Sequence, residues 1–268
     1  MARLFEYRDA DLFCHHSLDS SPSPTEFYMH AHERMEVLYF LSGDAEYLVE
    51  GSVYPLHPGE LLVMNRAEAH KLQLLSDKPY ERMVMHFSPS VLSGIDPDGL
   101  LLRPFADKPL GKQNHYVSDR FSALFSDFDV AGSYARIRLH MLLILANVLN
   151  EISTLTGSTS AISGEPESVS QQILQYVNQH LFENISLSTV SREFFLSPSQ
   201  LNRIFRRATG SSVGEYVRVK RLLAARELII TGSSPAYACT ACGFQNYSAF
   251  YRAYKEKFDV SPSGDRRK

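Results

Sequence analysis

The sequence predicts a two-domain α+β protein, in which a β-barrel with a pair of helices precedes an all-α C-terminal domain. Three observations carry this prediction. Short runs of Val, Leu, Tyr and Phe, separated by turn residues, fill about the first 110 residues. A segment rich in Ser, Thr, Gly and Pro follows at 156–168, and the apolar repeats after it have helical spacing. We therefore expect domains over 1–155 and 169–268, joined by a linker over 156–168.

The β-rich part contains HERMEVLYFLSG, AEYLVEGSVYPLHPGELLVMN and KLQLLSDKPYERMVMHF. Turn signals at Ser42-Gly43, Glu50-Gly51 and Pro58-Gly59 divide these runs into short strands. Strands that are this short and this evenly interrupted are typical of a sandwich or a barrel.

Two helices are expected after the strands. HYVSDRFSALFSDFD has apolar residues at helical spacing, namely Val117, Phe121, Leu124, Phe125 and Phe128. SYARIRLHMLLILANVLNEIS predicts a longer and more apolar helix. We expect the two to form an antiparallel pair. Their surplus apolar surface would either pack against the barrel or form a homodimer interface, and the second interpretation is favoured.

Composition limits the class of protein. The 268 residues, 44% of them hydrophobic, suffice for one large or two ordinary cores. No apolar run reaches the ~18 residues that a membrane span needs, and the N-terminus lacks the apolar stretch of a secretory signal. Three cysteines cannot form a disulfide framework. These features predict a cytoplasmic protein that does not enter a membrane.

The net charge of −3 conceals an asymmetry. After residue 168, Lys and Arg outnumber Asp and Glu, whereas the reverse holds before it. Of the 10 histidines, only His180 lies in the basic part. A basic module on an acidic body predicts binding to a polyanion through the C-terminal domain.

The segment ISLSTVSREFFLSPSQLNRIFRRATG predicts a first helix-turn-helix unit. Ser186 or Ser188 can cap a short helix, and Ser197 can cap the next, with Pro198 at its first position. The second helix would bury Leu201, Ile204 and Phe205. It would expose Ser199, Gln200, Asn202, Arg203 and Arg206. Short hydrogen-bonding side chains followed by arginines suit a helix that enters the major groove of DNA.

A long helix, SVGEYVRVKRLLAARELIITG, separates this unit from a second copy of the same plan. The copy, SPAYACTACGFQNYSAFYRAYKEKFDVSP, has a turn at Gly243-Phe244 and a helix that starts near Asn246. That helix would bury Phe250, Tyr254 and Phe258. It would expose Asn246, Tyr247, Ser248, Arg252 and Lys255. Two such helices on a rigid connector can enter successive major grooves, about 34 Å apart.

This C-terminal part resembles the DNA-binding domain of the AraC/XylS family of bacterial regulators. LSPSQLNRIFRRATG, YVRVKRLLAARELI and CGFQNYSAFYRAYKEKFDVSP carry the resemblance over about 100 residues. The resemblance implies double-stranded DNA and RNA polymerase as partners. By the resemblance, Ser199, Asn202 and Arg203 read bases in one groove, and Tyr247, Ser248 and Arg252 in the next. Arg206, Arg207 and Lys255 are expected to contact phosphates.

Two departures from the family pattern concern packing. The usual Ile-Ala in the first helix of the second unit is Ala238-Cys239, which removes apolar volume. The usual closing Tyr-Arg is Asp265-Arg266, so we expect the last turn of the chain to dock poorly.

The N-terminal part contains H-x-H-x3-E-x6-G, formed by His30, His32, Glu36 and Gly43. On a strand, the first three side chains share one face. With His70 downstream, the pattern resembles the cupin fold, whose metal site would be His30, His32, Glu36 and His70. Two or three histidines and one carboxylate suit a divalent transition metal.

Three interpretations of these residues remain: a small-molecule pocket without metal, which is favoured, a bound divalent metal, and structural histidines. The pocket would also use Tyr39 or Tyr47, Glu46, Arg82 and His86, and a sugar is the first effector class that the resemblance suggests. The favoured function is a DNA-binding transcription regulator, and not an enzyme, controlled by an effector in the barrel. The alternative is a metal-dependent cupin enzyme with an accessory helical domain.

Overall fold

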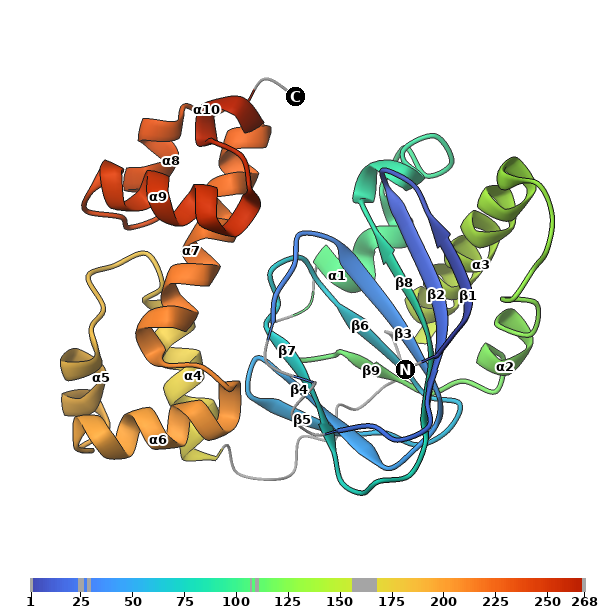
Figure 1. Ribbon diagram of the computed structural model, residues 1–268, viewed down its shortest axis with the longest axis horizontal. Coiled ribbons are helices and arrows are strands. Elements are labelled where there is room, and N and C mark those ends of the chain that lie inside the picture. Colours follow the sequence, from blue (N-terminus) through green and yellow to red (C-terminus); the bar gives the residue numbers. More distant parts are fainter. Residues whose placement is uncertain are drawn as a thin grey trace. The chain divides into compact units, whose positions relative to one another are not determined.

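The computed structural model describes residues 2–23, 27, 30–106, 108, 111–155 and 168–266 (Figure 1). The chain divides into two compact units, Met1–Glu165 and Pro166–Lys268. The predicted linker lies outside the described residues except for Ser168, which caps the first helix of the second unit.

The N-terminal unit consists of two antiparallel sheets that face each other across an apolar layer. The larger sheet has the order β1 (Ala2–Arg8), β2 (Leu12–Asp19), β8 (Tyr80–Phe87), β3 (Met35–Ser42), β6 (Leu61–Met64) and β9 (His115–Tyr116). The smaller has the order β5 (Ser52–Pro55), β4 (Ala45–Val49) and β7 (His70–Leu74). This is the β-rich, cupin-like domain that the strand pattern predicts.

Alternation along the strands divides the larger sheet into two faces. On β3, Leu38 and Phe40 face the smaller sheet. Val37 and Tyr39 point the other way, into the core beneath α3 (Tyr134–Leu155). Because both faces are covered, the whole of β3 from Met35 to Phe40 is buried.

The helix expected over 115–129 is wrong for most of its length. Only one turn, α2 (Phe121–Leu124), is helical, and His115–Tyr116 instead pairs with β6 at the edge of the sheet. Phe121, Phe125 and Phe128 are buried, so the apolar spacing is real, but strand pairing overrides the helical start and leaves Val117 exposed. The antiparallel helix pair is therefore not formed. The second helix is α3, as predicted, and short helical turns η2 (Pro89–Leu92), η3 (Leu100–Leu102) and α1 (Arg103–Ala106) precede it.

The C-terminal unit is all helical in its described residues. Its elements are α4 (Val169–Gln179), α5 (Leu187–Glu193), α6 (Pro198–Thr209), α7 (Val213–Ile230), α8 (Pro235–Ala241), α9 (Tyr247–Phe258) and α10 (Pro262–Asp265). The two predicted helix-turn-helix units are α5–α6 and α8–α9, and α7 connects them. Serine or asparagine caps each helix N-terminus, as Ser197 does for α6.

Both departures from the family pattern are accommodated. Ala238 is completely buried against α7 and α9. The expectation that the last turn docks poorly is wrong. The carboxylate of Asp265 accepts hydrogen bonds from Arg226 Nε at 2.6 Å and from the Tyr254 hydroxyl at 2.8 Å, and the residue is 3% exposed. A charge-assisted pair therefore fastens α10 to α7 and α9.

Candidate DNA-binding surface and effector-binding site

Helix α6 presents a polar edge formed as the sequence predicts. Ser197 and Gln200 form a capping box at its start, with Pro198 at the first helical position. Leu201 and Phe205 are completely or almost completely buried and fix the rotation of the helix. Ser199, Asn202, Arg203, Arg206 and Arg207 line one shallow hollow. All but the half-buried Asn202 are exposed, and so is Gln200. Ile204, expected inside, is half-buried.

Helix α9 presents the corresponding edge of the second unit. Asn246 caps it by accepting a hydrogen bond from the Ala249 backbone N–H at 2.9 Å. Phe250 and Tyr254 are fully buried, while Phe258 is half-buried. The predicted side chains Asn246, Tyr247, Ser248, Arg252 and Lys255 are all exposed. The structure therefore leaves the predicted polar edge of each unit accessible.

Within the C-terminal domain, the guanidinium of Arg221 connects the two helix-turn-helix units. Arg221, on α7, donates to the carbonyl of Leu181 at 2.7 Å and to that of Glu183 at 2.5 Å, both in the segment before α5. It also donates to the carbonyl of Gly243, in the turn of the second unit, at 2.7 Å. Three acceptors from two segments fix the position of the second turn relative to the start of the first unit.

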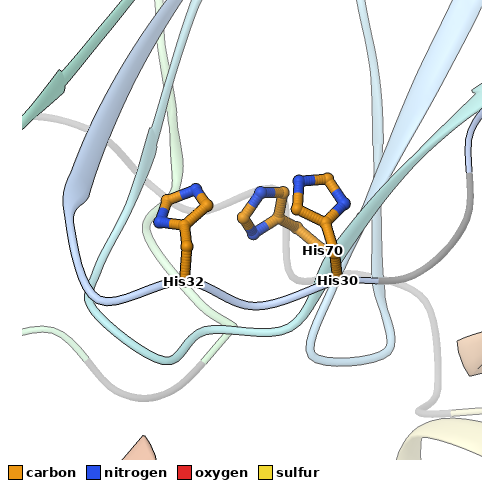
Figure 2. Close-up of side chains that lie close together, drawn as sticks. All are labelled: His30, His32 and His70. Carbon is orange, nitrogen blue, oxygen red and sulfur yellow. The ribbon is translucent and has the colours of Figure 1, made fainter. Parts of the chain in front are cut away.

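In the N-terminal unit, four histidines and one glutamate converge between the sheets. His30 and His70 exchange backbone hydrogen bonds at 3.0 and 2.9 Å, and Figure 2 shows their rings beside that of His32. Glu36, on β3, lies directly opposite His86 of β8. His30 is exposed and His70 fully buried, so the cluster extends from the surface into the interior. These five residues are called the histidine cluster below.

The motif predicted that these side chains meet, but the expectation that one strand carries them is wrong. His30 belongs to an isolated bridge, and β3 begins only at Met35, so no single strand carries His30, His32 and Glu36. The three side chains meet because the segment before β3 pairs with β7, through an antiparallel bridge between His30 and His70. The predicted metal set of His30, His32, Glu36 and His70 nevertheless comes together, and His86 joins it.

Glu36 is the electrostatic centre of the histidine cluster. One of its oxygens lies 2.8 Å from His32 Nε2, 3.3 Å from His70 Nε2 and 3.7 Å from His86 Nδ1. Burial alone would raise the pKa of Glu36, but the neighbouring His86, the hydrogen bond from His32 and the proximity of His70 hold that pKa well below its usual range. Burial works to lower the pKa of His70, but the Glu36 carboxylate beside it raises that pKa.

Other polar side chains extend the cluster along the inner face of β8. The guanidinium of Arg82 lies 4.5 Å from the centre of the Tyr80 ring. Arg82, Val84 and His86 alternate along β8 and therefore share one face. The ring of Tyr47 lies 6.3 Å from that of His70. Predicted pocket residues Arg82, His86 and Tyr47 are therefore in or beside the cluster.

Two predicted pocket residues are elsewhere. Tyr39 is on the opposite face of β3 from Glu36, where its ring stacks on Phe125 at 4.4 Å. Glu46 is on the opposite face of β4 from Tyr47 and accepts a hydrogen bond from Gln73 at 2.8 Å. In both cases a one-residue offset along a strand puts the side chain on the wrong side of the sheet.

The cluster offers two groups of metal-ligating atoms. The ligating atoms of His30, His32 and His70 lie within 4.8 Å of one another, and so do those of His32, Glu36 and His86. His70 Nε2 is buried and outside hydrogen-bond geometry, although it lies near Glu36. Nitrogen and carboxylate donors in this combination fit a divalent transition metal.

Two family models match the chain. The AraC-like ligand binding domain matches residues 21–146, which include the histidine cluster, and a helix-turn-helix domain matches residues 190–268, which include α6 and α9. The multiple antibiotic resistance protein MarA of Salmonella typhimurium is 30% identical over 91 residues, 34% of this chain and 72% of MarA. The chain belongs to the AraC family of transcriptional regulators.

Other relatives match the chain at different identities and over different lengths. The probable regulator LumQ of Photobacterium leiognathi is 34% identical over 89 residues, so the match spans 33% of this chain but only 36% of LumQ. SoxS of Salmonella typhimurium is 26% identical over 98 residues, 36% of this chain and 92% of SoxS. Among solved structures, ToxT of Vibrio cholerae has a TM-score of 0.41 at 12% identity, covering 96% of this chain and 95% of ToxT.

As an AraC-family member, the protein is a DNA-binding transcription regulator with an N-terminal ligand-binding domain, and not an enzyme. The cupin-enzyme alternative receives no support from these matches. No helix in the described ranges is long and apolar enough to span a membrane.

Two further residues, His15 and Tyr251, lie beside the histidine cluster and on the exposed edge of α9, and the motifs did not identify them. His15, on β2, is buried, bonds to Ser17 at 2.8 Å and stacks near His86 at 6.1 Å. The alternation Phe13-His15-Ser17 on one strand was the available signal. On α9, Tyr251 is 37% exposed, on the same face as Ser248, Arg252 and Lys255. The i, i+3, i+4 spacing could have identified it.

Proposed function

We propose that the histidine cluster binds a small, polar, hydroxyl-rich effector, with sugars the first class to test, and that this binding controls DNA recognition. The observation that carries the proposal is the convergence of five ionisable side chains inside the ligand-binding domain. Buried polar groups are costly unless they have a partner, so such clusters are retained where a ligand uses them.

The protonation states favour a ligand that accepts and donates hydrogen bonds. Burial lowers the pKa of His15 to about 3 and that of His86 to about 4. Both imidazoles are therefore neutral near pH 7, with one donor and one acceptor nitrogen each. Arg82 adds guanidinium donors to the same inner face. Neutral hydroxyls suit this mixture of donors and acceptors.

A divalent metal is the second candidate occupant, since neutral imidazoles are also metal ligands. His32, His70, His86 and Glu36 would hold it, with His30 at the solvent side. Such a metal would supply a Lewis-acidic centre to which effector hydroxyls could bind. Elemental analysis of the purified protein, repeated on His32→Ala, separates the two candidates, because only a bound metal would fall with the substitution.

For the DNA-binding part, we propose that α6 and α9 enter successive major grooves. Ser199, Gln200, Asn202 and Arg203 would face base edges in one groove, and Asn246, Tyr247, Ser248 and Arg252 in the next. Arg206, Arg207 and Lys255 would contact phosphates. A residue that contacts one phosphate should, when replaced, reduce the slope of log K against log salt by about 0.9.

We also propose that α3 forms a homodimer interface. Leu139 and Leu143, one turn apart, are 71% and 58% exposed. They line a groove of about 560 Å³ with Arg136, Asp127 and Asp129. Opposite charges beside one apolar stripe are suited to self-association across a two-fold axis. RNA polymerase is the proposed downstream partner, since the chain belongs to a family of transcription regulators.

Light scattering during gel filtration tests the dimer. Wild-type protein is expected to elute with twice the mass of one chain, and the Leu139→Ser, Leu143→Ser variant with that of a monomer. Leu100→Ser, at an exposed leucine in η3, is the control and should leave the mass unchanged. A wild-type monomer at micromolar concentration would reject the interface.

Gel retardation tests the regulatory proposal. The protein is expected to retard the DNA upstream of its own coding sequence, with an affinity that changes when a sugar from a thermal-shift screen is added. Arg82→Ala should abolish the response to the sugar while leaving retardation intact. Retardation that no tested polar molecule alters, together with no thermal shift, would count against the proposed effector class.

A further inference from the structure

The two recognition helices, α6 and α9, have the same plan, but the chemistry at the centre of their exposed edges differs. Both α6 and α9 have 12 residues. Each begins after an extended N-cap whose side chain accepts a backbone N–H three residues on, and each ends in a left-handed residue, Gly210 or Asp259. Equal caps and equal length set the same register, so residues can be compared position by position.

Some positions on the exposed edges of α6 and α9 carry the same type of side chain, and others differ. The equivalent pairs on the exposed edges are Ser199 and Ser248, Asn202 and Tyr251, Arg203 and Arg252, Arg206 and Lys255, and Arg207 and Glu256. The buried positions match as well, since Leu201 corresponds to Phe250 and Phe205 to Tyr254. The two helices therefore present the same edge, and the main change at its centre is Asn202 against Tyr251.

The two arginines are available for base recognition. Arg203 and Arg252 are both exposed, and neither has an ion-pair partner among the residues that the structure describes. A guanidinium forms paired hydrogen bonds with O6 and N7 of guanine, the most frequent specific contact in the major groove.

The residue before each arginine has a different preference. The side-chain amide of Asn202 can bond to N6 and N7 of adenine. Tyr251 offers an aromatic surface, 37% exposed, and Tyr247 one turn earlier is 44% exposed. The ring of Tyr247 also contacts that of Phe250, with centroids 5.8 Å apart, which limits its movement. An aromatic edge of this kind fits the C5-methyl group of thymine.

We propose that the operator is an asymmetric pair of sub-sites, each with a guanine read by Arg203 or Arg252. Beside that guanine, the first sub-site carries an adenine read by Asn202, and the second carries a thymine recognised through its methyl group by Tyr251. This inference rests on the proposed entry of α6 and α9 into successive grooves. The sub-sites are then about one helical turn, 10–10.5 base pairs, apart, and they are not a direct repeat.

The test starts from the full-length protein and a library of random DNA duplexes. Sequences that survive selection give the two sub-sites. The selected thymine is then replaced by uracil, which lacks only the C5-methyl group, and affinity is expected to fall about fourfold, the effect of burying one methyl-sized group. Replacement of the selected adenine by 7-deazaadenine, which lacks N7, should weaken binding on the order of fivefold or more.

Protein variants assign each effect to its residue. Tyr251→Ala should bind the thymine and uracil duplexes equally, while Tyr251→Phe, which keeps the ring, should still prefer thymine. Asn202→Ala should no longer distinguish adenine from 7-deazaadenine. Tyr251→Asn should change the preferred base from thymine to adenine in a repeated selection. Both positions are at least partly exposed, so folding should be preserved.

The outcomes separate the inference from the proposal beneath it. If selection yields no sequence, or only one sub-site, the two-groove arrangement fails. If two sub-sites appear but uracil binds as well as thymine, or Tyr251→Asn leaves the selected base unchanged, the assignment of Tyr251 is overturned and the two-groove arrangement stands.

Discussion

The Arg221 guanidinium donates to the carbonyl oxygen of Gly243 at 2.7 Å, which joins the connecting helix to the turn of the second helix-turn-helix unit. Gly243 has φ of +76°, and a Cβ at this position would lie 2.5 Å from the carbonyl oxygen of Phe182. Only glycine therefore permits the close approach on which the three bonds of Arg221 depend. These contacts fix the spacing of α6 and α9 for DNA.

Loss of either partner should weaken DNA binding across the two sub-sites. Arg221→Lys retains the charge but lacks the planar guanidinium that spans carbonyls in two segments, so the free energy of unfolding should fall by about 1–3 kcal/mol. Gly243→Ala should lower the free energy of unfolding by at least as much, because it introduces both backbone strain and a steric clash with Phe182. Urea unfolding and gel retardation on the selected duplex measure both effects. Arg218→Lys, half-exposed on the same helix, is the control and should change little.

Phe195 is expected to be a site where substitution stabilises the protein. It lies in the turn between α5 and α6, is 97% exposed and has φ of +53°. A left-handed conformation costs a residue with a Cβ roughly 1–2 kcal/mol, while glycine pays roughly 0.5–1 kcal/mol in entropy. Phe195→Gly should therefore raise the free energy of unfolding by about 0.5–1 kcal/mol. Phe195→Ala keeps the Cβ and should bring little gain; equal gains from both variants would show that strain is not the cause.

Much of this architecture could be predicted because local signals and tertiary contacts agree. Ser197-Pro198 and Gly210 determine both ends of α6, and Leu201 and Phe205 determine its buried face. Prediction failed where long-range contacts decide. His115–Tyr116 pairs with β6 despite a helical pattern, and Asp265 docks through Arg226 on a distant helix.

The histidine cluster shows the same difference between local signals and long-range contacts. The H-x-H-x3-E motif predicted which residues meet, but not that His30 reaches the cluster by pairing with His70 of β7. Tyr39 and Glu46 were misplaced because the face of a short strand depends on its register, and a one-residue shift reverses every side chain. The register is fixed here by pairing such as Glu36 with His86, which sequence spacing alone does not contain.

The stability of the N-terminal unit should depend on pH through Asp9. Its carboxylate accepts hydrogen bonds from the backbone N–H groups of Asp11 and Leu12, from the Tyr7 hydroxyl and, at 2.9 Å, from Arg138 on α3. Burial works to raise the pKa of Asp9, but the bonds from Asp11, Leu12 and Arg138 lower it overall. Its stabilising contribution is therefore complete above the unfolded pKa of about 3.9 and is lost as pH falls through the folded value.

Hydrogen exchange of β1 and β2 at a series of pH values tests this dependence. Relative to the wild type, Asp9→Asn should lose about 1–3 kcal/mol near pH 7, and the difference should disappear in acid. Asp77→Asn changes an exposed carboxylate and is the control. A difference between wild type and Asp9→Asn that stayed constant down to the acid limit would contradict the role of the charge.

The ionisation of His70 should depend on Glu36. Burial lowers the pKa of His70, and the neighbouring Glu36 carboxylate is the largest influence that raises it above the ordinary value of about 6.5, followed by Glu68. In Glu36→Gln, only the weaker effect of Glu68 still opposes burial, so the pKa of His70 should fall. The raised pKa means that His70 stabilises the fold below about pH 6.5, and this contribution is lost as pH rises through the folded pKa. NMR titration of the His70 ring proton, with chelator present, measures the shift directly. Glu46→Gln, on the opposite face of β4, should leave the titration unchanged. An unaltered pKa in Glu36→Gln would mean that Glu36 does not organise the histidine cluster.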